Sequence, residues 1–421
     1  MSEALARRLG TRDAVVVGLG SMIGAGVFSV WAPAAEAAGS GLLIGLALAA
    51  GVAYCNAVAS AQLAAQYPTS GGTYVYGRER LGEWWGFVAG WGFVIGKTAS
   101  CAAMALTFAA YASGGSLWAQ RVVGVAAVLT LTAVNYRGIT RTATAATVLV
   151  VLSLAALLLV LVVLNTGDRV DSIGAVGGVY GILQSAGLIF FAFAGYARIA
   201  TLGEEVREPE RTIPRAIPIA LLIVAVLYAV VGTSVLFAAG ADALAASKAP
   251  IVTALHAAGA AWASPIARVG AAVASLGSLL ALIAGVGRTT LAMARNGDLP
   301  GWLASVHEEH RVPDHAELAL GLVVAVLVLT TDLRGAIGFS SFGVLVYYAV
   351  ANASAYTQDA SDRRWPRALN VVGFVACLVL VVALPWRSVL VGVAVLAVGL
   401  AGRALALRAR GRRSPAPRSR A

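Results

Sequence analysis

The amino-acid sequence predicts an all-α polytopic membrane protein with 12 transmembrane helices. Of its 421 residues, 59% are hydrophobic and only 12% are charged, whereas soluble domains carry roughly 25% charged residues. The hydrophobic residues gather in twelve stretches of about 17 to 30 residues, each long enough to cross a hydrocarbon core of roughly 30 Å. Two of these stretches are interrupted by glycine. Together these observations predict that the chain lies in a lipid bilayer.

The expected spans follow one another closely along the chain. The first twelve residues contain no apolar core and no cleavage site, so we expect no removable signal peptide. We place the approximate boundaries of the spans at 13–36, 40–66, 84–112, 116–135, 142–164, 178–200, 215–239, 262–294, 316–332, 335–356, 367–384 and 387–406.

The net charge of +11 is distributed unevenly along the chain. If the amino terminus is inside the cell, most of the 31 lysines and arginines fall in the termini and in the loops after even-numbered spans. This asymmetry is the positive-inside pattern, and it predicts a multi-pass plasma (cell) membrane protein with both termini in the cytoplasm. The basic tail favours contact with anionic lipid, and we expect no nucleic-acid partner.

Four glycines lie within nine residues of the first span, at positions 18, 20, 24 and 26. Glycine is the poorest common helix former after proline, so the helix is expected to unwind here. A second break is expected at 190–196, inside the sixth span. Unwound backbone at membrane depth is tolerated only where it is buried in protein or lines a polar cavity. Two such breaks at matching places in two halves point to the substrate site of a secondary transporter.

The first break has two other interpretations. Residues 15–20 followed by Gly24 resemble a strand that enters a dinucleotide-binding loop, and Glu36 lies at a plausible distance for a ribose contact. The membrane spans that follow exclude the alternating strands and helices which that loop needs. A continuous helix whose small residues allow close packing remains an alternative. The density of glycine and the second break argue against it.

Five short motifs carry a resemblance to a known family. They occur at 20–28 (GSMIGAGVF), 67–74 (YPTSGGTY), 190–195 (FFAFAG), 204–214 (EEVREPERTIP) and 292–300 (AMARNGDLP). Together, and in this order, they resemble the amino acid-polyamine-organocation superfamily of permeases. The resemblance is strongest to its amino acid permease and cationic amino acid transporter branches.

The resemblance implies a leucine-transporter-type fold with a 5+5 inverted repeat and two additional C-terminal helices. The implied organisation is a cytoplasmic segment 1–12, a first repeat 13–165, a second repeat 166–357, two further spans within 358–406 and a basic cytoplasmic tail 407–421. It also implies that Phe191 is an aromatic gate over the substrate. An ordinary core phenylalanine is the alternative.

Backbone groups at the two breaks suit the two charged ends of an amino acid. A half-helix that begins near Gly26 points free N–H groups and the positive end of its dipole into the site, which favours a carboxylate. Unwound carbonyls favour an ammonium group. The candidate carboxylate donors are Gly24, Ala25 and Gly26, the candidate ammonium acceptors are the carbonyls of Met22, Phe191 and Ala194, and the neighbours Ile23, Phe190 and Gly195 complete the predicted site.

Two residues are candidates for coupling transport to an ion. Lys97 lies near the middle of the third span, where a charge is costly unless it pairs with carbonyls or cycles a proton. Relatives that couple to protons carry a lysine in the fifth span, and the resemblance aligns Ser153 with that position. Simple proton symport is therefore in doubt. Exchange, or symport with H⁺ or Na⁺ through another group, stays open.

The sequence shows no catalytic arrangement, and we expect no enzyme activity, cofactor or metal. The three cysteines lie inside apolar spans without metal-ligand spacing. No span centre holds an aspartate or glutamate, which favours a neutral amino acid over a cationic one as the substrate. The alternatives are a polyamine or organocation carrier and a non-transporting amino acid sensor.

Overall fold

The computed structural model describes residues 9–69, 71–113, 116–137 and 142–411. These ranges hold helices and no named strand; the isolated bridges are Leu9 with Val206 and Gly39 with Val176. Parts of the predicted terminal segments 1–12 and 407–421 lie outside the described residues.

The helices of the first half are α1 (Thr11–Met22), α2 (Ala25–Ser29), α3 (Trp31–Ala38), α4 (Leu42–Gln66), α5 (Thr73–Leu81), α6 (Glu83–Ala112), α7 (Leu117–Tyr136) and α8 (Thr142–Thr166). Those of the second half are α9 (Val179–Phe193), η1 (Ala194–Tyr196), α10 (Ala197–Ala200), α11 (Pro209–Ala245), α12 (Pro250–Ala257), η2 (Ala261–Ala263), α13 (Ser264–Arg295), η3 (Gly301–Ala304), α14 (Asp314–Thr330), α15 (Leu333–Tyr356), α16 (Arg367–Ala383) and α17 (Trp386–Gly411).

Ten segments within the described ranges are long and apolar enough to cross a membrane. Two expected spans, 316–332 and 367–384, correspond instead to α14 and α16, which have 17 residues each. The sequence did not predict α5 and α12, because each is a short helix between two spans. The structure thus confirms a polytopic helical protein, and the number twelve stays a prediction.

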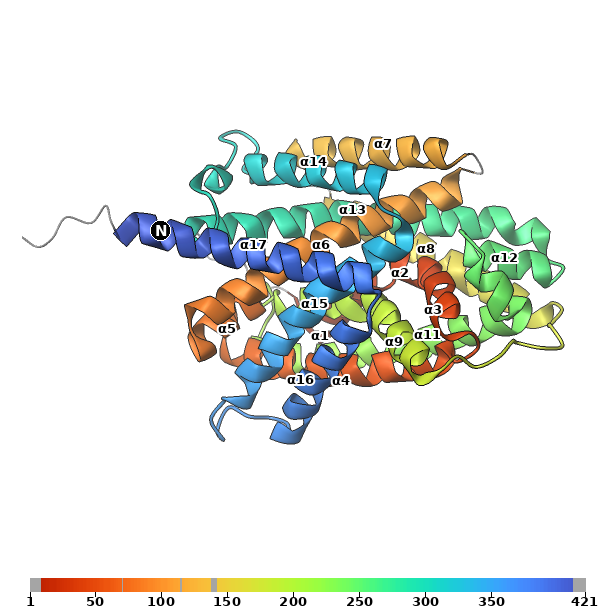
Figure 1. Ribbon diagram of the computed structural model, residues 1–421, viewed down its shortest axis with the longest axis horizontal. Helices are drawn as coiled ribbons and strands as arrows, with labels where there is room; N and C mark the ends of the chain where they lie inside the picture. The colour runs from red at the N-terminus through yellow and green to blue at the C-terminus, as the bar shows by residue number, and fades with distance from the viewer. Residues whose placement is uncertain (1–8, 70, 114–115, 138–141, 412–421) are drawn as a thin grey trace, which may run out of the picture.

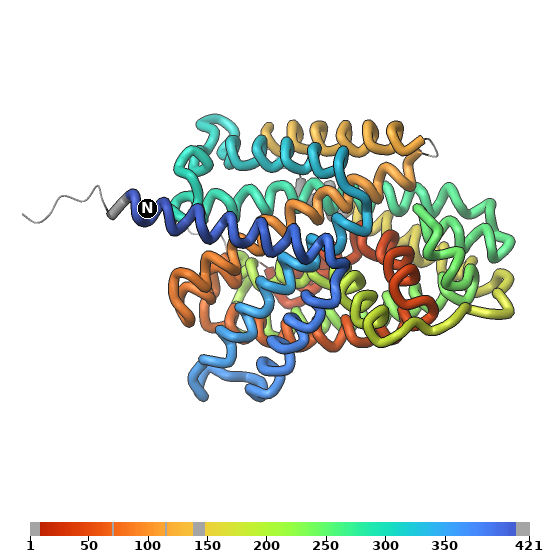
Figure 2. The backbone as a smooth tube through the Cα atoms, viewed as in Figure 1, coloured from red at the N-terminus to blue at the C-terminus, as the bar shows by residue number. Residues whose placement is uncertain are grey.

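The helices pack in a bundle. Most of the long ones run roughly along the longest axis, as the tube in Figure 2 shows. Helix α6 packs against α13 and α15, α4 packs against α9 and α11, and α8 packs against α13. Helices α7 and α14 lie side by side at one edge of the bundle (Figure 1).

Glycine allows α6 and α15 to pack with their backbones in contact. A Cβ atom added to Gly96 would lie 3.0 Å from the carbonyl oxygen of Ser340. One added to Gly343 would lie 2.7 Å from the Cα of Gly96. Small residues at such crossings are typical of helices that associate in a membrane, where van der Waals contact drives association. The contact between Gly96 and Gly343 therefore fixes the position of α6 against α15, and α6 carries Lys97.

A group of four charged residues, hereafter the charge cluster, joins α5, α6, α17 and the segment after α13. Arg403 lies 3.2 Å from both Glu83 and Asp298, and Arg78 lies 2.9 Å from Asp298. The Tyr74 hydroxyl donates a 2.7 Å hydrogen bond to Asp298. Burial and this hydrogen bond raise the pKa of Tyr74 to about 12, so the phenol stays a donor at neutral pH. The cluster ties α17 to the rest of the bundle.

Candidate functional site

The first helix is interrupted where the sequence predicts. Helix α1 ends at Met22, Ile23 has φ −80° and ψ 69°, and Gly24 has φ −121° and ψ −149°. Helix α2 then begins at Ala25 and continues into α3 through Val30, whose backbone is itself helical. The unwound segment is thus only two residues long. The two earlier glycines of the first span, at positions 18 and 20, remain inside α1.

The second break is a 3₁₀ turn and not the unwound segment that the sequence predicts. Helix α9 ends at Phe193, residues Ala194–Tyr196 form η1, and the chain continues as α10. The N–H of Ala194 donates to the carbonyl of Phe191, one of the predicted ammonium acceptors. Three-residue turns of this type commonly end helices. The carbonyl of Phe191 thus already accepts a backbone hydrogen bond within this turn.

The two breaks lie in direct contact. A Cβ atom added to Gly26 would lie 2.8 Å from the Cβ and 2.9 Å from the Cα of Ala192. One added to Gly195 would overlap the carbonyl of Ser21, next to Met22. Neither glycine can carry a side chain without moving the opposite backbone. The close approach of the two broken helices thus depends on these two glycines.

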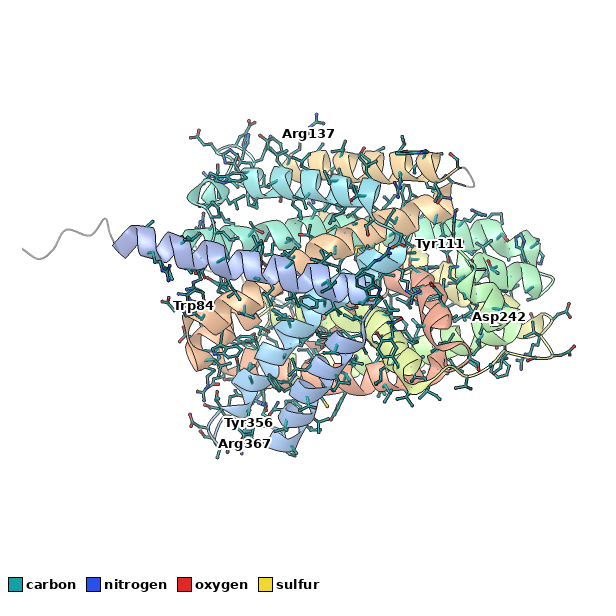
Figure 3. All side chains as sticks on the ribbon, in the orientation of Figure 1. Trp84, Tyr111, Arg137, Asp242, Tyr356 and Arg367 are labelled. Atoms are coloured by element: carbon teal, nitrogen blue, oxygen red, sulfur yellow. The ribbon has the colours of Figure 1, made fainter. Side chains whose placement is uncertain are left out.

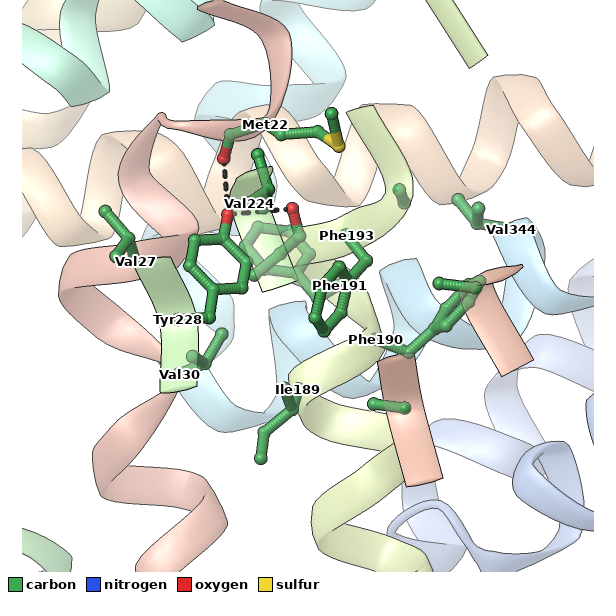
Figure 4. Packing of buried hydrophobic residues seen from close by; sticks show 14 of the residues in the cluster. Met22, Val27, Val30, Ile189, Phe190, Phe191, Phe193, Val224, Tyr228 and Val344 are labelled. Carbon is green, nitrogen blue, oxygen red and sulfur yellow. Dashed lines mark hydrogen bonds between the residues drawn. The ribbon is translucent and has the colours of Figure 1, made fainter. Parts of the chain in front are cut away.

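Tyr228 of α11 connects the two breaks. Its hydroxyl oxygen lies 2.6 Å from the carbonyl oxygen of Met22 and 3.1 Å from that of Ala192 (Figure 4). Its ring packs on Phe193, with 5.0 Å between the ring centroids. The single hydroxyl proton serves one carbonyl at a time, and the shorter distance favours Met22. The sequence analysis did not single out this residue, because one tyrosine in an apolar span carries no spacing signal.

Lys97 reaches the second break from α6. It comes thirteen residues after Trp84 and fourteen before Tyr111, so it lies about 20 Å along the helix from either residue. Figure 3 shows Trp84 and Tyr111 toward opposite ends of the bundle. Lys97 is 8% exposed, and its Nζ donates a 3.2 Å hydrogen bond to the carbonyl of Ala194. The sequence left two roles open for Lys97, pairing with carbonyls and cycling a proton. This hydrogen bond is a pairing with a carbonyl.

The electrostatics of the second break favour a cation. Ala194 caps the C-terminus of α9, where the helix dipole is negative. A positive group there gains about 0.3–1 kcal/mol at a surface and up to about 2 kcal/mol when partly buried. Within the described ranges, no ion pair involves Lys97, and its hydrogen bond is to a backbone carbonyl. The Lys97 ammonium is thus held by a helix end and not by a carboxylate.

The other predicted site residues are buried at or beside the breaks. Phe190 is 0% exposed and packs edge-on against Tyr348, while Phe191 is 7% exposed. A Cβ atom added to Gly24 would overlap the hydroxyl of Ser278, so α13 also faces the first break. Most of the predicted substrate-binding residues are buried, with Gly195 half-buried.

Ser153 lies on α8 and is fully buried. Its hydroxyl has no hydrogen-bond partner among the residues that the structure describes. Val150, one turn earlier on α8, lies 3.2 Å from the position of a Cβ added to Gly20. Helix α8 therefore packs on the first broken helix near the predicted site. Among the described residues, no hydrogen bond joins Ser153 to Lys97, the other coupling candidate.

Two interrupted helices that meet inside a bundle of long apolar helices are typical of an integral membrane protein. A profile of the amino acid permease family matches residues 9–399. The chain belongs to this family, as the motifs of the sequence predict. It is therefore a membrane transporter and not an enzyme.

Several relatives are similar over nearly the whole chain. An uncharacterized transporter of Mycobacterium tuberculosis is 58% identical over 405 residues, which cover 95% of this chain and 91% of the relative. The branched-chain amino acid permease of Bacillus subtilis is 26% identical over 94% of this chain and 92% of the relative. Cationic amino acid transporter 4 of Homo sapiens is 29% identical over 84% of this chain and 60% of the relative.

Proposed function

We propose that this protein is a secondary active transporter that moves amino acids across the membrane by alternating access. The observation that carries the proposal is the contact between the two breaks, where backbone donors and acceptors of two interrupted helices are brought together. Discontinuous helices that meet near the bilayer centre are typical of substrate sites in secondary transporters. The family supports an amino acid as the substrate.

The packing of the helices supports twelve spans with a 5+5 inverted repeat. If the broken helix of each half is taken as its first span, α4 corresponds to α11, α6 to α13, α7 to α14 and α8 to α15. The contact of α4 with α9 is then equivalent to that of α1 with α11, and the contact of α6 with α15 to that of α8 with α13. The structure contains both contacts of each equivalent pair. Helices α16 and α17 are the two additional spans.

A 17-residue helix is about 26 Å long, which is close to the thickness of the hydrocarbon core. Helices α14 and α16 therefore complete the twelve spans. An even number of spans and the positive-inside distribution of charge support a plasma membrane protein with both termini in the cytoplasm.

The substrate carboxylate is held at the start of α2. The first N–H groups of any helix have no acceptor inside that helix, and the dipole is positive there. The N–H of Gly24 already donates to the carbonyl of Met22 at 2.9 Å, so the free donors are those of Ala25 and Gly26. The ammonium group of the substrate takes carbonyls at the ends of α1 and α9. It competes there with Tyr228 and Lys97.

We favour exchange as the transport mode, with symport of H⁺ or Na⁺ as the alternative. The resemblance aligns Ser153 with the lysine of proton-coupled relatives, and a serine hydroxyl cannot be a cation. Lys97 donates a hydrogen bond to the Ala194 carbonyl, and exchange needs no proton to leave this lysine.

Transport by purified protein in proteoliposomes tests this function. Labelled amino acids should enter, one or a few types much faster than the rest, and unlabelled internal amino acid should accelerate their entry. A protein that binds an amino acid but never transports it would be a sensor. Transport of polyamines without competition by amino acids would make it an organocation carrier.

A further inference from the structure

Lys97 brings a buried positive charge to the predicted substrate site without a carboxylate to balance it. The lysine is 8% exposed in the middle of α6, and its Nζ lies 3.2 Å from the Ala194 carbonyl. Acidic residues of the described chain lie at helix ends and in loops, as Asp13, Glu36 and Asp298 do. Buried charges in membrane spans usually pair with an opposite charge or face a functional site. Since no carboxylate of the described chain pairs with Lys97, we infer that its charge acts on the substrate.

The carbonyl that Lys97 occupies is one that a substrate ammonium would need. The Tyr228 hydroxyl lies within hydrogen-bond distance of the carbonyls of Met22 and Ala192 and donates to one of them at a time, while Lys97 donates to the carbonyl of Ala194. Two donors of the protein, the Tyr228 phenol and the Lys97 ammonium, thus already face the acceptors at the negative ends of α1 and α9. A zwitterionic substrate tolerates this arrangement, because its carboxylate offsets its ammonium group. A second ammonium or a guanidinium on the side chain has no such compensation.

We propose that Lys97 is a specificity-determining residue that excludes amino acids with cationic side chains. The proposal rests on the proposed function and names its substrate class, which is amino acids with neutral or acidic side chains. This substrate class differs from the one in the name of the human relative, cationic amino acid transporter 4.

Lysine and norleucine form a matched pair of probes, because they differ only by the terminal ammonium group. The wild-type protein should bind norleucine at least about 100-fold more tightly than lysine, measured by displacement of a labelled neutral amino acid. This factor matches the repulsion of two unit charges about 6 Å apart at an effective permittivity of about 20. An apolar side-chain site would also reject lysine, so a variant is needed to assign the effect to Lys97.

Lys97→Met removes the charge and keeps an unbranched side chain that is one atom shorter. The ratio of the two affinities should then fall at least tenfold, through tighter binding of lysine. Lys97→Arg, which keeps the charge, should preserve the ratio. Thr98→Val is the matched control on the neighbouring residue, whose hydroxyl bonds within α6 to Val94, and it should also preserve the ratio.

Three results would overturn the proposal. The first is wild-type protein that binds lysine as tightly as norleucine, a result that needs no variant to fold. The second is an unchanged ratio in a Lys97→Met protein that still binds norleucine. The third is wild-type protein that binds no amino acid, which would overturn the proposed function as well. In the first two cases the protein still binds amino acids, so the failure concerns Lys97 alone.

Discussion

The Tyr228 hydroxyl lies 2.6 Å from the carbonyl of Met22, the last residue of α1, and within 3.1 Å of the Ala192 carbonyl. One side chain from α11 thus connects two helix ends that come from different halves of the chain. Both carbonyls are buried, so each needs a donor from the protein or from the substrate. Tyr228 gives its one proton to one of these acceptors at a time, the shorter distance favouring Met22, and holds the two helix ends together.

Tyr228→Phe should weaken both the fold and the site. Removal of the hydroxyl leaves buried carbonyls without this donor, at a cost of about 1–3 kcal/mol in the free energy of unfolding. Thermal melting of the purified protein should show the loss, and amino acid binding should weaken with it. Tyr54→Phe, on the exposed surface of α4, is the control. Equal melting temperatures for the two variants would show that the bridge contributes nothing.

Substitution of Gly26 should abolish transport while the protein remains expressed and inserted. Even an alanine side chain would lie within 3 Å of Ala192, and leucine would separate α2 from α9 altogether. Overpacking of this kind costs about 1–3 kcal/mol. Gly51→Ala is the control, since a Cβ at Gly51 meets nothing within 4 Å. Near-normal substrate affinity in purified Gly26→Leu protein would mean that the site assignment is wrong.

The location of the breaks could be predicted from the sequence, but their geometry could not. Glycine spacing and hydropathy predict the interruption near Gly24. The same spacing also predicts unwinding at positions 18 and 20, where packing inside the protein keeps α1 helical instead. The second break carries one glycine, and its backbone tightens to a 3₁₀ turn because the turn still satisfies part of its hydrogen bonding.

The contacts of Tyr228 and Lys97 depend on how distant helices pack, and no local pattern encodes them. Lys97 could be noticed as a charge inside a span, which is costly wherever it lies. Its partner, Ala194, lies 97 positions away in another helix. Tyr228 gave no comparable signal, since tyrosine is not costly in a membrane span when its hydroxyl has an acceptor.

Loss of Arg403 should destabilise the protein without removing the substrate site. Its guanidinium and the Asp298 carboxylate are both nearly fully buried, and breaking a buried ion pair typically costs about 3–5 kcal/mol. Arg403→Ala should therefore lower the melting temperature of the purified protein markedly. Arg408→Ala, on an exposed position of the same helix, should leave it nearly unchanged. A similar small effect for both would show that the charge cluster does not stabilise α17.

Uptake should require amino acid inside the vesicle and should ignore imposed proton and sodium gradients. This follows from exchange with a lysine that keeps its proton. The measurement is labelled uptake into proteoliposomes with and without internal substrate, at several gradients. Wild-type uptake that a pH gradient drives, and that Lys97→Gln uncouples from that gradient, would instead make Lys97 the carrier of the coupling proton.

The most direct test of the central claim, that the two breaks form one amino acid site, is a comparison of an amino acid with its decarboxylated amine. The start of α2 offers N–H groups and a positive dipole end that only a carboxylate can use. In a displacement assay on purified protein, the transported amino acid should compete well and the corresponding amine poorly. Equal competition by the amine would contradict the account and indicate a polyamine carrier.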